Sequence, residues 1–373
     1  MGNVPNLRFP EFSGEWENCQ IANILSIGSG RDYKHLEKGN IPVFGTGGYM
    51  TSVNECIYDG ETTFIGRKGS INKPFYYNGK FWTVDTLFYT HSFNKTTPKF
   101  VYCLFQTINW LRYNEASGVP SLSKDTIEKI KVFIPQLDEQ RKISEMLSVI
   151  DERIATQNKI IDKLQSLING LNDSLYQQCG NGIMTSFSKL GQSYSGLSGK
   201  SADDFGTGKP YITYLNVYSN NVVNENDYQY VRISDGEKQN IVKYGDVLFT
   251  LSSETPEEVG IGSVYLGKSD VYLNSFCFGI HITDTKVVFP PYLSYYVSST
   301  PFRKFIYPYA QGSTRFNLCK ADFEKARIKM PSLENQKRIY FILSHIASKV
   351  ETETKLWDLF KFQKQYLLRQ MFI

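Results

Sequence analysis

The chain contains one long sequence pattern twice. Pro135–Ile143 (PQLDEQRKI) matches Pro331–Ile339 (PSLENQKRI), an offset of 196 residues (331 − 135 = 196). At the same offset the match continues without a gap to Asp162 and Asp358. Repetition at such a distance predicts two copies of a whole structural unit within one chain.

The segments upstream of this pattern have diverged further but keep their order. They share a Gly-acidic-apolar strand, a strand with a small polar pair and a helix opened by proline, at Gly60–Ile65 and Gly245–Phe249, Val84–Phe88 and Leu273–Cys277, and Pro98–Tyr102 and Pro290–Ser294. We therefore expect a first α/β domain at 1–136, a long helix at 137–179, a second α/β domain at 180–332 and a second long helix at 333–373.

Both long helices carry a heptad stripe, in which apolar residues recur at steps of three and four. The first stripe contains one polar position, as does the second, at Ile143, Leu147, Ile150, Ile154, Gln157, Ile161 and Leu164, and at Ile339, Leu343, Ile346, Val350, Glu353, Trp357 and Phe360. An isolated stripe of this kind favours packing against the helix's own domain. Two stripes in register favour helices that pair with each other, and antiparallel helices of about 35 residues would separate the two domains by roughly 50 Å.

One feature interrupts the first helical pattern. Asn169 and Gly170 lie inside it, and glycine costs about 1 kcal/mol relative to alanine in a helix. The pair is a candidate kink or early end, which leaves the length of the first helix open.

The pattern Pro-x-Leu-x-x-Gln-x-x-Ile leading into a long helix, present at both Pro135 and Pro331, resembles the ends of the target-recognition domains and the conserved helices of Type I restriction-modification specificity subunits. The resemblance covers essentially the whole chain. It implies an α+β fold in which two α/β target-recognition domains are separated and followed by long helices that form an antiparallel coiled coil.

The same resemblance implies a role. Each domain would read one half of a bipartite site on double-stranded DNA, and the helices would set the gap and dock two modification (methyltransferase) subunits. Restriction (nuclease-translocase) subunits would join in the full complex. The chain itself would be a non-catalytic subunit without a cofactor or metal, with AdoMet, ATP and Mg expected on the partner subunits.

Base edges are read by Arg, Lys, Asn, Gln, Ser, Thr and acidic side chains on loops. Such residues follow the predicted strands and precede the last short helix of each domain, at Arg67, Lys68, Ser70, Asn72 and Lys73, at Ser117, at Ser252, Ser253 and Glu254, and at Ser313, Thr314 and Arg315. Arg67 is a candidate for a bidentate contact with guanine, Lys68 and Lys73 for phosphate contacts, and Glu254 for a contact with a cytosine amino group. The alternative for each loop is an ordinary solvated turn.

Motifs that would indicate catalysis are incomplete. Phe289–Tyr292 (FPPY) imitates a methyltransferase corner but begins with Phe289, whose side chain cannot accept a hydrogen bond. A helix-start proline pair is therefore the preferred interpretation. Gly199–Ser201 (GKS) imitates the end of a phosphate-binding loop, but Tyr194 stands where the first glycine belongs. The four histidines, His35, His91, His281 and His345, stand alone in the sequence.

Composition narrows the remaining choices. The net charge is only +4, which neither requires nor excludes a nucleic-acid partner. The cysteines are scattered and read as reduced thiols, at Cys19, Cys56, Cys103, Cys179, Cys277 and Cys319. With no apolar run of membrane-spanning length, we expect a cytoplasmic protein that does not enter a membrane.

Two alternatives stay open at this point. Besides a specificity subunit, the chain could be a stand-alone or half-site DNA-binding module of another restriction-methyltransferase. It could also be a coiled-coil adaptor whose domains bind protein. The salt dependence of duplex binding separates the second alternative from any DNA reader.

Overall fold

The computed structural model describes residues 2–178 and 182–373. It divides into two compact units, one formed by Met1–Lys159 with Thr354–Ile373 and the other by Ile160–Glu353. Each unit therefore holds one α/β domain, which we call a head, together with a part of each long helix. Cys179 lies outside the described residues.

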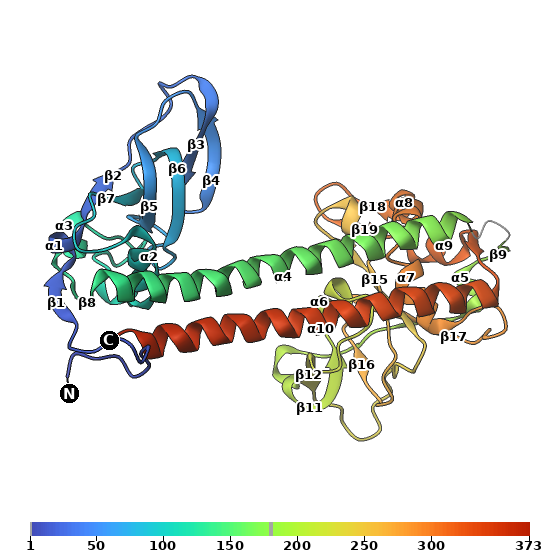
Figure 1. Cartoon of the computed structure of the whole chain (residues 1–373). Helices are drawn as coiled ribbons and strands as arrows, with labels where there is room; N and C mark the ends of the chain where they lie inside the picture. Colours follow the sequence, from blue (N-terminus) through green and yellow to red (C-terminus); the bar gives the residue numbers. More distant parts are fainter. Residues whose placement is uncertain (1, 179–181) are drawn as a thin grey trace. The chain divides into compact units, whose positions relative to one another are not determined.

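The head of the first unit is built around a six-stranded sheet of order β2-β7-β5-β6-β3-β4 (Figure 1). Neighbouring strands are antiparallel except for the parallel pair β3 and β6. The bounds are Ser26–Ser29 for β2, Lys38–Gly45 for β3, Gly48–Val53 for β4, Tyr58–Gly66 for β5, Phe75–Thr83 for β6 and Leu87–His91 for β7.

Shorter elements connect this sheet to the first long helix. They are β1 (Glu17–Gln20), α1 (Ile21–Ile24), α2 (Pro98–Thr107), the 3-10 helix η1 (Trp110–Tyr113), α3 (Lys124–Lys129) and β8 (Lys131–Ile134). β1 pairs with β8. As expected from the sequence, a proline opens α2, and the Thr97 hydroxyl caps the helix by accepting from the Phe100 amide.

The second head keeps the order of the first but divides its strands among four sheets. The sheets are β10 (Gly191–Ser195), β17 (Cys277–Ile282), β13 (Val247–Thr250) and β15 (Gly262–Val264); β12 (Tyr228–Val231), β11 (Phe205–Ile212) and β16 (Tyr272–Leu273); β14 (Ser252–Ser253), β19 (Phe316–Leu318) and β18 (Ala310–Gln311); and β20 (Ile328–Met330) with β9 (Ile183–Thr185).

Helical segments of the second head are short. They are α5 (Phe187–Leu190), α6 (Tyr214–Ser219), α7 (Leu293–Tyr296), α8 (Thr300–Ile306) and α9 (Lys320–Lys325), with the 3-10 helices η2 (Ala202–Asp204), η3 (Pro256–Glu258), η4 (Pro290–Tyr292) and η5 (Tyr307–Tyr309). The proline pair of the sequence FPPY lies in η4, which leads directly into α7. The helix-start interpretation of this motif is confirmed.

Strand pairing corrects the upstream sequence alignment by one residue. Gly66 pairs with Leu87 in the first head, and Thr250 pairs with Cys277 in the second. Leu87 is therefore equivalent to Cys277, whereas the sequence match had set Leu87 against Phe276. The small polar pair lies in a turn between two strands in each head, and sequence similarity in so short a turn is too weak to fix the register.

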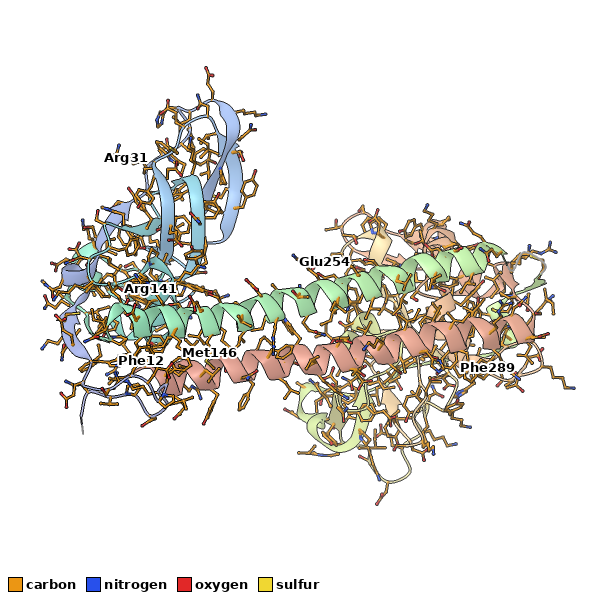
Figure 2. All side chains as sticks on the ribbon, in the orientation of Figure 1. Phe12, Arg31, Arg141, Met146, Glu254 and Phe289 are labelled. Carbon is orange, nitrogen blue, oxygen red and sulfur yellow. The ribbon has the colours of Figure 1, made fainter. Side chains whose placement is uncertain are left out.

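In the first unit, α4 (Leu137–Gln178) packs against α10 (Leu333–Met371) in the antiparallel sense. Ile143, Leu147 and Ile150 near the start of α4 share one apolar core with Leu367 and Met371 near the end of α10. Met146, labelled in Figure 2, packs against the same core. An ion pair of 2.6 Å between Lys364 Nζ and Asp151 joins the two helices beside it.

In the second unit the opposite ends of the same helices meet. Ile339 and Leu343 near the start of α10 share a core against which Ile168 and Leu171 of α4 pack. All fourteen predicted stripe residues are buried or half-buried, whereas the residues between them are mostly exposed. The stripes thus face each other as well as their heads, and the predicted antiparallel coiled coil is confirmed.

Gly170 does not end the first helix, because α4 continues to Gln178. A Cβ atom at Gly170 would meet no other atom within 4 Å. No neighbouring group therefore requires a glycine at this exposed helical position. The first long helix has 42 residues.

A buried glutamine in each copy of the repeated motif fixes the long helix to its head. Gln140 is fully buried. Its Oε1 accepts from the Thr97 amide and the Thr96 hydroxyl, and its Nε2 donates to the carbonyls of Lys95 and Pro135. These contacts join the first turn of α4 to the loop before α2.

Gln336 makes the same kind of contacts in the second unit. It is fully buried, its Oε1 accepts from the Phe289 amide at 2.8 Å, and its Nε2 donates to the carbonyls of Val287 and Pro331. Since buried backbone groups need partners, this explains why the glutamine recurs in the motif. It bonds to four buried or part-buried groups in the first copy and to three in the second.

The N-terminal and C-terminal segments of the first unit also pack against its core. The Leu7 amide donates to the Gln370 carbonyl at 2.8 Å, and the Phe372 ring stacks on Phe100 with centroids 5.4 Å apart. Arg8 forms a bidentate ion pair with the buried Glu139, at 2.7 Å for each nitrogen. The last turn of α10 is thus part of the first head's core.

The glutamine contacts make a stability prediction. Gln140→Ala leaves buried donors and acceptors unpaired, so we expect the free energy of unfolding of the first unit to fall by about 2 kcal/mol. Urea denaturation followed by tryptophan fluorescence measures this, because all four tryptophans of the chain, Trp16, Trp82, Trp110 and Trp357, belong to the first unit. Gln136→Ala, an exposed glutamine one turn earlier, is the control. Equal losses in the two variants would contradict the assignment.

Candidate nucleic-acid interface

The two candidate loops of the first head lie side by side. Beyond the end of β5, the Gly69 amide donates to the Pro120 carbonyl at 2.8 Å, and the Leu122 amide donates to the Arg67 carbonyl at 2.9 Å. The Arg67 amide donates in turn to the Thr86 carbonyl at 2.8 Å. Loop 67–73, segment 116–121 and the turn before β7 therefore form one surface.

The second head repeats two of these backbone hydrogen bonds, the one that the Arg67 amide donates and the one that the Arg67 carbonyl accepts, and we call this pair of bonds the loop frame. The Leu251 amide donates to the Phe276 carbonyl at 2.9 Å, and the Leu318 amide donates to the Leu251 carbonyl at 2.8 Å. Ser252 pairs with Asn317 between β14 and β19. Leu251 is thus equivalent to Arg67, and Phe276 is equivalent to Thr86.

The candidate side chains of the first head are at the surface. Those exposed are Arg67, Lys68, Ser70, Asn72, Lys73 and Ser117. The Arg67 guanidinium donates to the Asp85 carbonyl at 3.2 Å and lies 5.9 Å from the centre of the Phe88 ring. It is held at the loop by these contacts but keeps exposed donors.

In the second head the candidates divide into two groups. Glu254 (labelled in Figure 2), Ser313, Thr314 and Arg315 are exposed. Ser252 and Ser253 are only 6% and 7% exposed. The Ser253 hydroxyl donates to Glu258 at 3.0 Å, so the two serines support the loop frame from inside.

An ionised carboxylate supports each loop frame. Glu115 accepts hydrogen bonds from the Thr126 and Ser123 hydroxyls, which lower its pKa. Glu258 accepts from the Tyr218 hydroxyl at 2.8 Å and from Ser253, and these bonds lower its pKa likewise. Both groups are engaged with their own loops, so neither offers a free negative charge to DNA phosphates.

The structure adds residues that sequence patterns did not single out. A Cβ atom at Gly69 would lie 3.7 Å from the Thr46 hydroxyl oxygen, which places the tip of the β3–β4 hairpin beside loop 67–73. In the second head, Leu215 is 67% exposed and Phe276 is 58% exposed. Phe276 had been assigned to a predicted strand and Leu215 to no element, so the sequence patterns gave no signal that either side chain reaches solvent.

Lys200 of the GKS sequence is structural. Its side chain is 8% exposed, and Nζ donates to the Arg232 carbonyl and to Glu237, each at 2.6 Å. The hydrogen bond from Lys200 is the largest cause that lowers the pKa of Glu237 to about 2. The ammonium group thus closes the loop on itself.

The sequence had suggested that His281 stands alone, but its side chain has two partners. Its Nδ1 lies 2.9 Å from Oδ1 of the buried Asp246, and its ring stacks on Tyr194 with centroids 4.2 Å apart. Tyr194 donates to the same carboxylate at 2.7 Å. Burial raises the pKa of Asp246, and the three side chains join β10, β17 and the start of β13 at the end of these strands that is remote from the loop frame.

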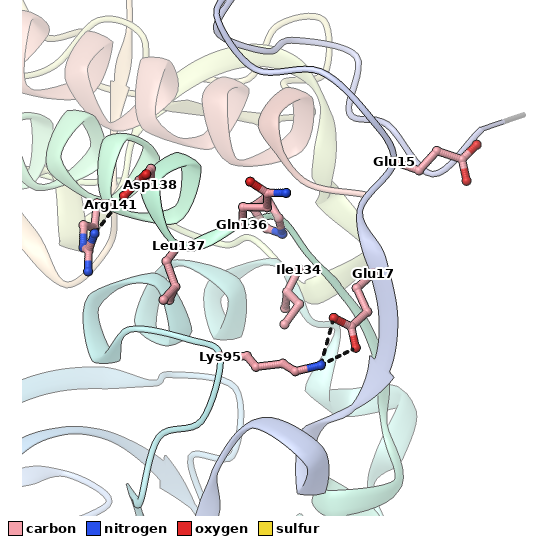
Figure 3. A pocket seen from close by; sticks show the side chains of 9 residues that line it. Glu15, Glu17, Lys95, Ile134, Gln136, Leu137, Asp138 and Arg141 are labelled. Atoms are coloured by element: carbon pink, nitrogen blue, oxygen red, sulfur yellow. Dashed lines mark hydrogen bonds and ion pairs between the residues drawn. The ribbon is translucent and has the colours of Figure 1, made fainter.

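A hollow of about 560 Å³ lies where the first head meets the start of α4 (Figure 3). Two ion pairs lie on its wall, Lys95 with Glu17 at 3.2 Å and Arg141 with Asp138 at 2.8 Å. These are solvent-exposed ion pairs of the usual weak kind. They offer neither a nucleophile beside a base nor a set of metal ligands.

Among residues 2–178 and 182–373, no group of three or more His, Cys, Asp or Glu side chains is arranged to hold a metal ion. Within the same ranges, no helix is both long enough and apolar enough to cross a membrane.

Two heads that carry the same loop frame, joined to paired helices, define a tandem-recognition protein. The family described as Type I restriction modification DNA specificity domain matches residues 13–166 and 197–358, so the chain belongs to this family.

Individual relatives agree with this assignment. The chain is 25% identical over 142 residues to a type I restriction enzyme specificity subunit of Haemophilus influenzae, covering 36% of this chain and 37% of that protein. It is 23% identical over 156 residues to the EcoprrI specificity subunit of Escherichia coli, covering 39% and 38%. The chain thus spans well under half the length of these curated relatives.

The solved structure of a Type I restriction-modification S subunit from M. genitalium has the same fold. It superposes with a TM-score of 0.62 at 13% sequence identity, over 99% of each chain. The predicted fold class is therefore confirmed over the whole length, although the individual DNA-contacting residues stay predictions.

Arg67 yields a prediction for the first head. Arg67→Ala should lose roughly 1–3 kcal/mol of DNA binding and relax the preference at one base pair. Lys68→Ala is the comparison, because loss of a phosphate contact weakens binding about equally on all sequences. Binding measured on duplexes that vary one base at a time separates the two effects. Unchanged affinity and base preference in the Arg67 variant would remove it from the interface.

Proposed function

We propose that this chain is the DNA-specificity subunit of a Type I restriction-modification complex and that it acts in the cytoplasm. Each head reads one half of a bipartite site on double-stranded DNA. The observation that carries the proposal is the loop frame, which brings predicted base-reading residues of distant segments together in both heads. Family membership supports the same role.

The proposal assigns catalysis to other chains. Two modification (methyltransferase) subunits, and in the full complex the restriction (nuclease-translocase) subunits, bring AdoMet, ATP and Mg. This chain supplies the sequence preference alone. The paired charges of the hollow at the first head and the structural engagement of Lys200 and His281 support a non-catalytic role.

The docking surface for a modification subunit includes an apolar face of α10 in the first unit. Leu359, Phe362 and Tyr366 recur at steps of three and four, so they share one side of the helix. They are 63%, 69% and 54% exposed. This side is roughly opposite the stripe that faces α4, and three large apolar side chains in solvent are typical of a protein interface.

The helices set the unread gap in this proposal. α4 is one continuous helix of 42 residues, about 60 Å at 1.5 Å per residue. B-DNA advances about 34 Å per turn, so the length of α4 corresponds to a little under two turns of the duplex. A stand-alone half-site module would need neither the second head nor the paired stripes.

Methylated-base sequencing tests the function. In cells that carry this chain with its modification subunit, we expect one bipartite motif to be methylated, and the motif should disappear when the chain is deleted. The purified complex should bind that duplex with a steep salt dependence, near −5 on a log–log plot for about six phosphate contacts. A protein-binding adaptor would give no motif and no salt-dependent duplex binding.

A charge on the exposed face of α10 tests the docking surface. Phe362→Glu should weaken assembly with the modification subunit by at least about tenfold, because a buried charge at an apolar interface lacks a partner. Gln363→Glu adds the same charge one residue further, outside the apolar face, and should assemble normally. Titration by analytical ultracentrifugation measures both, and equal affinities would exclude this face.

A further inference from the structure

We propose that the second head recognises the C5 methyl group of thymine through Phe276 and Leu215. This inference rests on the proposed function and deepens it, since it names the base chemistry that one head reads. It starts from the loop frame, which makes the two heads comparable position by position.

Phe276 occupies the position of Thr86 in the loop frame. Its carbonyl accepts from the Leu251 amide at 2.9 Å, as the Thr86 carbonyl accepts from Arg67. Its amide donates to the Asn274 side chain at 2.9 Å. The backbone is thereby fixed on both sides, while the ring is 58% exposed. The turn is ordered, but burial of the exposed ring contributes little to its stability. This arrangement favours a role for the ring in contacting a partner.

Leu215 lies in α6, the short helix that follows β11. In the first head the Val84 amide donates to Phe44, and in the second the Asn274 amide donates to Ile212, so β3 and β11 end at equivalent points. The first head continues there into the tip of the β3–β4 hairpin.

At the same point the second head continues into α6. The Thr213 hydroxyl caps this helix, and the Tyr214 hydroxyl donates to the Ser252 carbonyl at 2.8 Å. That bond ties α6 to loop 251–254. Leu215, the next residue, is 67% exposed.

The arginine in the loop frame of the first head also has no counterpart in the second head. Leu251 stands where the first head has Arg67, so this position of the second head lacks the bidentate contact with guanine that an arginine offers. Arg315, exposed in the neighbouring hairpin between β18 and β19, supplies a positive charge for a phosphate. The second head thus combines a polar rim with an exposed aromatic ring on the loop frame and an exposed leucine on the neighbouring helix α6.

DNA chemistry selects the ligand of such a surface. Side chains of Phe and Leu neither donate nor accept hydrogen bonds, so they discriminate among bases only by apolar contact. In the major groove the thymine methyl group is the apolar feature of the base edges. We therefore assign at least one A·T pair to the half-site of the second head, with its methyl group against Phe276 or Leu215.

Deoxyuridine provides the test, because it lacks only this methyl group. In the assembled complex with the modification subunit, each thymine of the methylated motif is replaced singly by deoxyuridine and the Kd is measured. We expect about a fourfold rise at one or two positions of one half-site, as for the burial of one methyl group. In Phe276→Ala or Leu215→Ala, the duplexes with and without that methyl group should bind equally.

Tyr244→Ala is the matched control, since it removes another exposed ring of the same head, 59% exposed at the start of the segment that leads into β13. It should keep the discrimination, and all variants should keep their base preference in the other half-site. A wild-type complex that binds its motif but ignores every methyl group would overturn the inference and leave the function standing. Retained discrimination in both variants would do the same. Loss of specific binding to any motif would instead remove the proposed function.

Discussion

Two buried glutamine side chains carry the organisation of this molecule. Each long helix is useful only if its first turn is rigidly joined to a head, and Gln140 and Gln336 make that joint by satisfying backbone groups of the preceding loop and of the proline five residues earlier. The net free energy of such bonds is modest, but leaving the buried groups unpaired is costly. The recurrence of this residue, in a motif otherwise free to vary at its exposed positions, follows from that asymmetry.

The sequence predicted the parts of the fold that depend on long periodic patterns. The tandem heads and the two heptad stripes, Ile143 to Leu164 and Ile339 to Phe360, follow from spacing, whereas the antiparallel pairing of the helices was implied by the family resemblance. Strand register did not, because side chains have been exchanged across a strand pair: Gly28 faces Tyr89 in the first head, whereas Tyr194 faces Gly279 in the second. In each pair a Cβ atom on the glycine would come within about 2.2 Å of the tyrosine ring. A reversed pair conserves volume but not sequence.

The same distinction applies to the candidate interface. Sequence patterns identified the loops, and the loop frame shows that each pair of them lies together. They did not identify which side chains reach solvent: Ser252 and Ser253 lie inside, while Phe276 and Leu215 lie outside. Backbone hydrogen bonds hold the frame, so side chains on it are free to differ. One scaffold can therefore present a basic surface in one head and a partly apolar surface in the other, as two unequal half-sites require.

The arrangement of the compact units has a consequence for the order of folding on the ribosome. Residues 160–353 form one unit, whereas the other needs Thr354–Ile373 as well as the first 159 residues. Leu367, Met371 and Phe372 are buried in the core of that first unit. Domains generally fold in the order of synthesis, but here the head translated first must wait for the last helical turns, and the head translated second has all its residues earlier. Nascent chains would thus expose the Trp16 and Phe100 surface until translation has passed Phe372.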